Sequence, residues 1–215
     1  MTNQDIQLLI QAVEKADSAN DLLETVENLA EARHPEAIAT LIQVLGYNNP
    51  GAAVAAVEGL IHLGDLAVPI LLEQIDGYNY GARAWATRAL AGIGHPKALD
   101  LLIEAAKRDF ALSVRRSAAK GLGNIRWAQL PDAEVTPAQT QALDTLITVS
   151  QDPEWVVRYA ASVSLEQLAT SLTPTQPTLV SQILQRFNKM METEEELSVK
   201  ARVQWALQNM CSLET

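Results

Sequence analysis

Cysteine and histidine are nearly absent from this 215-residue sequence, and their scarcity excludes several kinds of site. Cys211 is the only cysteine, so the chain can form neither a disulfide framework nor a cluster of metal-binding thiolates. The three histidines, His34, His62 and His95, are scattered and lack the spacing of shared zinc ligands. We therefore expect no metal, no bound cofactor and a reducing, cytoplasmic setting.

Long apolar runs are also missing, and aromatic residues make up only 5% of the chain. No stretch approaches the ~18 apolar residues that a membrane-spanning helix needs. The first residues, MTNQDIQLLIQAVEKADS, are amphipathic and acidic, without the basic start and apolar run of a signal peptide. We expect neither membrane insertion nor export. Alanine and leucine dominate while β-branched runs are scarce, which indicates an all-helical protein.

Positive charge is scarce overall, since the formal net charge is −10, and this argues against a nucleic-acid binder. The basic residues are unevenly spread, however. Residues 83–126 hold nine Lys or Arg against three acids, so a basic middle lies between two acidic ends.

What the sequence does contain is an internal repeat. The tripeptide GYN occurs at 46–48 and again at 77–79, and aligning the two copies brings a nine-residue frame into register. The frame recurs every 30 to 43 residues, ending at Leu60, Leu90, Leu122, Leu165 and Leu207, with a weaker copy ending at Leu29. This period predicts an α–α superhelix of about five to six helix pairs, forming a single domain over residues 1–215. Two copies are longer, and we expect their extra residues in polar, proline-bearing surface loops at Ala128–Gln139 and Thr170–Pro177.

Four positions of the frame are small or apolar in every copy. The first, fifth, eighth and ninth residues share one stripe of a helix, so this stripe is the predicted core. The second position is basic in four copies: Arg83, Arg115, Arg158 and Lys200. Because it recurs, we expect a structural ladder in which each cation bonds an acid or a carbonyl of a neighbouring repeat.

The frame VRRSAAKGLGNI resembles the HEAT-like repeat of the phycobilisome lyase superfamily, and the resemblance covers nearly the whole chain. The run YNYGARAWATRALAGIG is similar to the F-type subunit of the heterodimeric E/F phycocyanobilin lyases. This resemblance implies an E-type partner subunit and phycocyanobilin as the substrate. It also implies the reaction, in which a cysteine thiol of the phycocyanin alpha subunit adds to the ethylidene group of bilin ring A and forms a thioether.

Residues that differ between copies are the candidates for a site. The third and seventh frame positions point away from the core stripe, and in HEAT-like solenoids this helix lines the concave surface. We therefore expect one groove formed by Trp85, Arg88, Arg116, Lys120 and Tyr159. Arginine pairs carboxylates bidentately and aromatic rings stack on flat surfaces, so the set suits a conjugated dianion such as a linear tetrapyrrole with two propionates.

Specific roles follow from this interpretation. Arg83, Arg88 and Arg116 are predicted to bind the propionates, and Trp85 and Tyr159 to stack on the bilin. Tyr78 is a further candidate for bilin binding, although the repetition of GYN favours a packed turn residue. Tyr80 is the candidate proton donor, and Asp76 is a candidate catalytic acid by proximity alone. The alternative source of that acid is the E-type partner.

Several alternatives stay open at this point. A phycobilisome degradation or chromophore-detachment factor of the same superfamily, or a scaffold without a small-molecule site, would share the generic frame. No cysteine lies near a histidine, so we expect attachment without isomerisation of the bilin. Trp127 and Trp155 are expected to anchor the core. Trp205 is expected on an outward face, where it either docks a partner or is covered by the Thr170–Pro177 loop.

Overall fold

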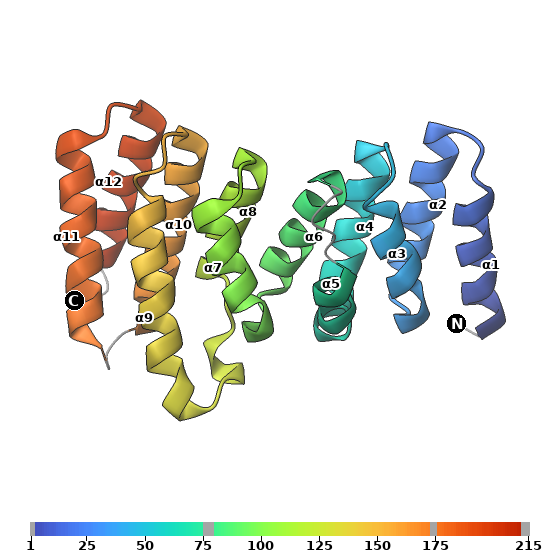
Figure 1. Ribbon diagram of the computed structural model, residues 1–215, viewed down its shortest axis with the longest axis horizontal. Coiled ribbons are helices and arrows are strands. Elements are labelled where there is room, and N and C mark those ends of the chain that lie inside the picture. Colours follow the sequence, from blue (N-terminus) through green and yellow to red (C-terminus); the bar gives the residue numbers. More distant parts are fainter. Residues whose placement is uncertain (1–2, 75–79, 173–175, 212–215) are drawn as a thin grey trace. The chain divides into compact units, whose positions relative to one another are not determined.

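The computed structural model describes residues 3–74, 80–172 and 176–211. Within these ranges every regular element is an α-helix or a short 3₁₀ turn, which confirms the predicted all-α class. The chain forms two compact units, residues 1–95 and 96–215, and each is a stack of helix pairs (Figure 1). The single-domain organisation over residues 1–215 stays a prediction. Asp76 and Tyr78, two of the predicted site residues, lie outside the described residues.

The first unit contains three helix pairs. Its α-helices are α1 (Asn3–Lys15), α2 (Ala19–Glu31), α3 (Ile38–Val44), α4 (Pro50–Leu63), α5 (Val68–Gln74) and α6 (Tyr80–Ile93). Short 3₁₀ turns, η1 (Pro35–Ala37) and η2 (Gly64–Leu66), lead into α3 and α5. The frame helices α2, α4 and α6 pack in succession, with α4 between the other two.

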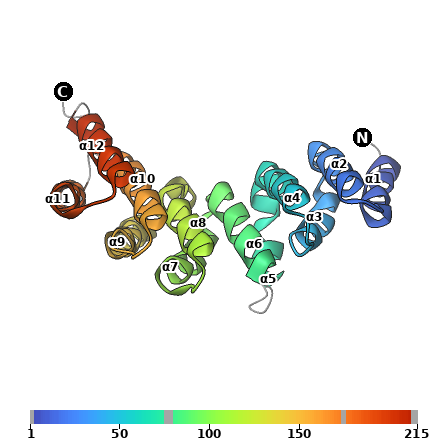
Figure 2. The same cartoon turned by 90° about the horizontal axis from the view of Figure 1, so that it is seen from above.

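The second unit repeats this plan. It begins with η3 (Pro96–Ala98) and holds α7 (Leu99–Arg108), α8 (Leu112–Gly123), η4 (Trp127–Gln129), α9 (Asp132–Val149), α10 (Trp155–Leu172), α11 (Pro177–Thr193) and α12 (Leu197–Cys211). The frame helices α8, α10 and α12 form one layer and α7, α9 and α11 form the other (Figure 2). The twelve α-helices of the described residues thus make six pairs, as the period predicted.

Local signals in the sequence explain where these helices begin. The side chain of Asn49 accepts a hydrogen bond from the amide of Ala52 at 3.1 Å, and Pro50 occupies the first helical position of α4. The same Asn49 donates to the carbonyl of Ala19 at 2.9 Å, so one side chain starts a helix and ties it to the preceding repeat. His34 caps η1 through its Nδ1 atom, which accepts from the amide of Glu36.

The predicted core stripe is confirmed. At the fifth frame position every side chain is buried, from Ala56 in α4 to Val203 in α12. The eighth position is small because the helices approach closely there. A Cβ atom added at Gly59 would come within 2.7 Å of the Ala30 Cβ atom, so a larger residue would force α2 and α4 apart.

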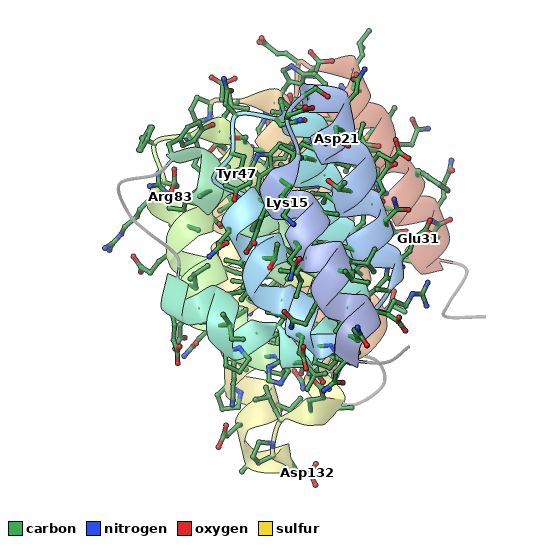
Figure 3. The ribbon with its side chains drawn as sticks, turned by 90° about the vertical axis from the view of Figure 1, so that its right-hand side faces the viewer. Lys15, Asp21, Glu31, Tyr47, Arg83 and Asp132 are labelled. Atoms are coloured by element: carbon green, nitrogen blue, oxygen red, sulfur yellow. The ribbon has the colours of Figure 1, made fainter. Side chains whose placement is uncertain are left out.

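The loops predicted for the longer copies are confirmed only in part: residues 128–131 and Gln176 lie outside the α-helices, but the other described residues of both segments are helical. Asp132 begins α9, an 18-residue helix that contains Pro137, and Figure 3 shows Asp132 at the free end of that helix. Acidic residues in its first turn favour the helix N-terminus, and Gln139 is buried where it accepts a hydrogen bond from Gln176 at 2.8 Å. Thr170–Leu172 similarly belong to the end of α10. The extra residues therefore lengthen helices.

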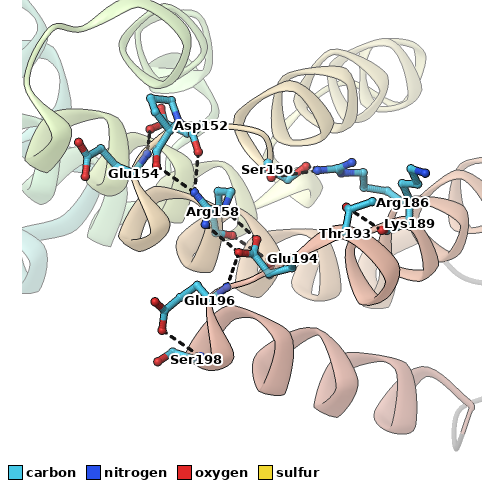
Figure 4. A network of polar contacts seen from close by, with 12 residues as sticks. Ser150, Asp152, Glu154, Arg158, Arg186, Lys189, Thr193, Glu194, Glu196 and Ser198 are labelled. Carbon is cyan, nitrogen blue, oxygen red and sulfur yellow. Dashed lines mark hydrogen bonds and ion pairs between the residues drawn. The ribbon is translucent and has the colours of Figure 1, made fainter.

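The predicted arginine ladder is confirmed for two of its members. Arg115 donates to both carboxylate oxygens of Asp152, at 2.7 and 3.2 Å, and to the carbonyls of Asp109 and Phe110. Arg158 repeats the arrangement one helix pair later: it donates to both oxygens of Glu194, at 2.8 and 2.7 Å, and to the carbonyls of Asp152 and Pro153 (Figure 4). Each guanidinium thereby clamps the loop before its own helix to the loop before the next frame helix.

The Arg158 clamp makes stability depend on pH. Its hydrogen bonds are the main reason that the pKa of Glu194 is lowered from its usual range. Because the folded-state pKa is lowered, Glu194 stabilises the fold above its unfolded pKa of about 4.3, and this contribution is lost as the pH falls through the lowered value. We expect the free energy of unfolding to fall more steeply below about pH 4.3 in the wild type than in Glu194→Gln, as measured by urea denaturation at several pH values.

The matched control is Glu195→Gln, which removes an exposed carboxylate from the same loop. This variant should keep the wild-type pH profile. Identical profiles for the wild type and Glu194→Gln would show that the clamp does not contribute in this way.

Candidate functional site

The predicted site residues of the first unit lie together on α6. Tyr80 is 44% exposed, and the Arg83 guanidinium carbon lies 5.9 Å from the centre of its ring. One turn further along, the guanidinium carbon of Arg88 lies 5.5 Å from the Trp85 ring centre. Both arginines are therefore within cation–π range of an aromatic side chain of their own helix, and Arg88 is exposed. Such pairs leave flat, positively charged surfaces along α6.

The predicted residues of the second unit line a groove between α8 and α10. Its volume is about 580 Å³, and its walls include Arg116 and Lys120 from α8 and Tyr159 and Val163 from α10. These are the third and seventh frame positions, and all four side chains reach the surface. Because residues four apart share one helix face, each wall presents its pair in line. The structure thus brings together three residues that the sequence predicted to converge.

Trp155 lies at the surface and not in the predicted core. It was expected in the core with Trp127, but only Trp127 is buried, whereas Trp155 is 44% exposed and lines the groove. Trp155 opens α10 one turn before Tyr159, so the two rings follow the same face of that helix. One signal in the sequence indicated this position. Trp155 directly follows the loop Gln151–Glu154, so it lies in the first turn of the helix, before the core stripe begins.

The corresponding groove of the first unit has a different chemistry. It lies between α2 and α4, has a volume of about 510 Å³, and is lined by Glu27, Glu31 and Glu58 together with Arg33 and His62. Glu27 and Glu58 hold the seventh frame position, which is Lys120 in α8. The same scaffold therefore forms an acidic groove in one unit and a cationic, aromatic groove in the other. Repeat structure alone does not require this difference.

The α8–α10 groove suits a flat anion. Arg116 and Lys120 supply two positive charges on one wall, and Trp155 and Tyr159 supply two rings on the other. No acid is among the residues that line the groove, so a carboxylate entering it meets no repulsion from its walls. Whether α6 and this groove serve one ligand stays a prediction.

A larger depression, of about 980 Å³, runs along α11, and most of its lining residues are polar or charged. Arg186 lies in its lining and donates to the Ser150 hydroxyl at 2.6 Å and to the Ser150 carbonyl at 3.0 Å. Burial lowers the pKa of Arg186. None of the predicted site residues lines this depression, and aromatic side chains are missing from its lining residues, so it does not share the chemistry of the α8–α10 groove.

Comparison with known proteins agrees with the repeat architecture. Residues 68–138 match a family described as HEAT repeats, and residues 142–172 match one described as HEAT repeat. A designed armadillo repeat protein in complex with a peptide shares the fold with a TM-score of 0.60, over 95% of this chain and 98% of that chain, at 16% identity. The fold and groove therefore define a HEAT-type helical-repeat protein with a cationic, aromatic groove.

Relatives with higher sequence identity show the family to which the chain belongs. The chain is 56% identical to "Phycocyanin alpha phycocyanobilin lyase CpcF" of Synechocystis sp., over 96% of this chain and 94% of that protein. It is 49% identical to "Phycocyanobilin lyase subunit beta" of Nostoc sp., over 94% and 97%. The solved complex of CpcE and CpcF of phycocyanin lyase from Nostoc sp. contains a chain 50% identical, with a TM-score of 0.74 over 81% of this chain and 99% of that one. The chain belongs to the family of F-type phycocyanobilin lyase subunits.

Two further observations bear on the predicted absences. In the described residues no helix has the length and apolar character required to cross a membrane. The same residues contain no group of three or more His, Cys, Asp or Glu side chains placed to hold a metal ion.

The contrast between Trp127 and Trp155 is directly testable. Trp155→Ala should change the free energy of unfolding by less than about 1 kcal/mol, because an exposed side chain leaves no cavity. Trp127→Ala should cost about 3–5 kcal/mol, because a buried indole does leave one. Chemical denaturation followed by circular dichroism compares the two variants, and equal losses would return Trp155 to the core.

Proposed function

We propose that this chain is the F-type subunit of a heterodimeric lyase that attaches phycocyanobilin to a cysteine of the phycocyanin alpha subunit. The observation that carries the proposal is the near full-length identity of 56% with a relative named for that activity. A second relative, 53% identical over 90% of this chain, is named "Phycobilisome maturation protein". Maturation favours attachment of chromophore over its detachment.

The α8–α10 groove is the proposed bilin site within this chain. Its volume of about 580 Å³ lies within the range of roughly 300–1,000 Å³ typical of small-molecule sites. The guanidinium of Arg116 and the ammonium of Lys120 pair with propionate carboxylates, while Trp155 and Tyr159 cover the pyrrole rings. Arg83, Trp85 and Arg88 of α6 offer the same chemistry within the first unit, and we propose them as further bilin-binding residues there.

The proposed reaction needs no redox partner. The sulfur of the acceptor cysteine forms a bond to the exocyclic CH carbon of the ring A ethylidene double bond. The electron pair of that double bond takes up a proton at the ring carbon. The thiol supplies the equivalent of that proton, so atoms and charge balance. Phycocyanobilin is therefore a substrate, and the proposed enzyme holds no cofactor. The contribution of this chain is to fix the bilin in one conformation, since positioning alone is worth up to about 7–11 kcal/mol.

Tyr80 is the proposed proton donor. Tyr80 is half-exposed beside Arg83 and has a hydroxyl suited to general acid catalysis. Asp76 is the second proposed acid within this chain, and the E-type subunit is the alternative source. No isomerisation is proposed, because the chain has a single cysteine at position 211.

The setting follows from the same proposal. Relatives named in the complex of CpcE and CpcF point to an E-type protein as the partner of this chain. The name of the relative called "Phycobilisome maturation protein" supports the cyanobacterial cytoplasm as the proposed setting.

The groove is tested by mixing the chain with its E-type partner, phycocyanobilin and the apo-phycocyanin alpha subunit. The readout is a bilin-fluorescent band that survives denaturing electrophoresis. The double substitution Arg116→Ala/Lys120→Ala should slow adduct formation roughly 10- to 100-fold, because charged hydrogen bonds to the propionates are lost. Arg88→Ala reports whether α6 takes part.

Arg108→Ala is the matched control, because Arg108 is an exposed cation that pairs with Glu104 on the same helix. It should leave the rate unchanged. Bilin spectra that shift without a covalent band would indicate a carrier or detachment factor, and no spectral change would leave a scaffold.

A further inference from the structure

The loops that precede the frame helices of the second unit expose large apolar side chains. Phe110 and Leu197 are each 78% exposed, Trp155 is 44% exposed and Leu112 is 43% exposed. They come from three loops, 109–112, 152–155 and 194–197, which are separated by more than thirty residues of sequence. Exposed apolar side chains that gather in one place mark interaction surfaces, whereas scattered ones do not.

The arginine clamps show that these three loops are neighbours. Arg115 binds the carbonyls of Asp109 and Phe110 and, through its other edge, the carboxylate of Asp152. Arg158 binds the carbonyl of Asp152 and the carboxylate of Glu194 in the same way (Figure 4). Each loop is thus held to the next by one guanidinium. We call this edge the rim and define it by Phe110, Leu112, Glu154, Trp155, Glu195 and Leu197.

The rim borders the α8–α10 groove. Trp155 belongs to both, and Ser198, which lines the groove, directly follows Leu197. The side of the groove formed by α8 is cationic, whereas the rim is acidic. Glu154 and Glu195 are exposed there, and the carboxylates of Asp152 and Glu194 are already held by arginine. The two surfaces therefore attract different ligands.

We propose that the rim docks the acceptor polypeptide, through a segment that carries apolar residues flanked by Lys or Arg. This inference rests on the proposed function, because an acceptor thiol has to reach a bilin bound in the groove and the rim is the protein surface beside it. Apolar contacts with Phe110 and Leu197 supply affinity, and the exposed carboxylates steer a basic segment toward the groove while repelling a second acidic surface.

The test uses the heterodimer with Phe110→Ser/Leu197→Ser, two substitutions outside the residues that line the groove. Adduct formation is measured against the concentration of apo-phycocyanin alpha subunit. We expect KM for the acceptor to rise about tenfold, since large side chains at the centre of an interface carry much of its affinity. The value of kcat, the visible spectrum of bound phycocyanobilin and heterodimer assembly should remain those of the wild type.

Leu8→Ser/Leu66→Ser is the matched control, because these leucines are 60% and 59% exposed in the first unit. It should leave KM unchanged. A second variant, Glu154→Gln/Glu195→Gln, tests the charges: acceptor association should become slower and less sensitive to salt than in the wild type.

Three outcomes would overturn the proposal. The first is a KM in the rim variant equal to that of the leucine control, and the second is loss of the heterodimer, which would make the rim a subunit interface. The third is loss of the bilin spectrum, which would assign the rim to the bilin site. Biolayer interferometry of apo-subunit binding separates the two proposals. A wild type that forms no adduct, but binds the apo-subunit more tightly than the rim variant does, refutes the lyase activity while leaving the rim supported.

Discussion

The bidentate pairing of an arginine with a carboxylate one repeat away is the interaction on which the second unit depends. Arg115 and Arg158 each satisfy two backbone carbonyls and one carboxylate, so the loop at the start of each frame helix is fixed to its neighbour. The paired side chains are largely buried, and losing one partner would leave a desolvated charge. Because the clamps fix where α8 and α10 begin, they also fix the register of the groove between them.

Fixing the scaffold at the second position leaves the third and seventh positions available for function. These residues face away from the core stripe, so their identity hardly affects packing. Glu58 in α4 and Lys120 in α8 occupy the same position of the frame, and each lines a groove against the neighbouring frame helix. A repeat protein can therefore change the charge of one groove without disturbing the others.

Much of the fold was predictable from the sequence because helix packing follows the period. The frame predicted the number of helix pairs, the buried stripe and the ladder role of Arg115 and Arg158, since each follows from the spacing, whereas the partners Asp152 and Glu194 came only from the structure. The segment at residues 128–139 was not predictable in this way. Its prolines suggested a loop, whereas acidic first-turn residues and the buried Gln139 extend α9. Trp155 was misplaced because it precedes the frame, where periodicity carries no information. Arg116, Lys120 and Tyr159 were found because they differ between copies.

The separation of charge on the second unit connects its scaffold to its proposed chemistry. A bilin dianion and a polypeptide acceptor have to meet at one point, yet a single cationic surface would bind the first and repel a basic segment of the second. The structure places cations at Arg116 and Lys120 inside the groove and exposed acids at Glu154 and Glu195 beside it. The clamp arginines of the same helices are neutralised by the carboxylates of Asp152 and Glu194. The cationic groove and the acidic rim can thus be neighbours, because the charges of the ladder arginines and their carboxylate partners cancel and add little to either surface.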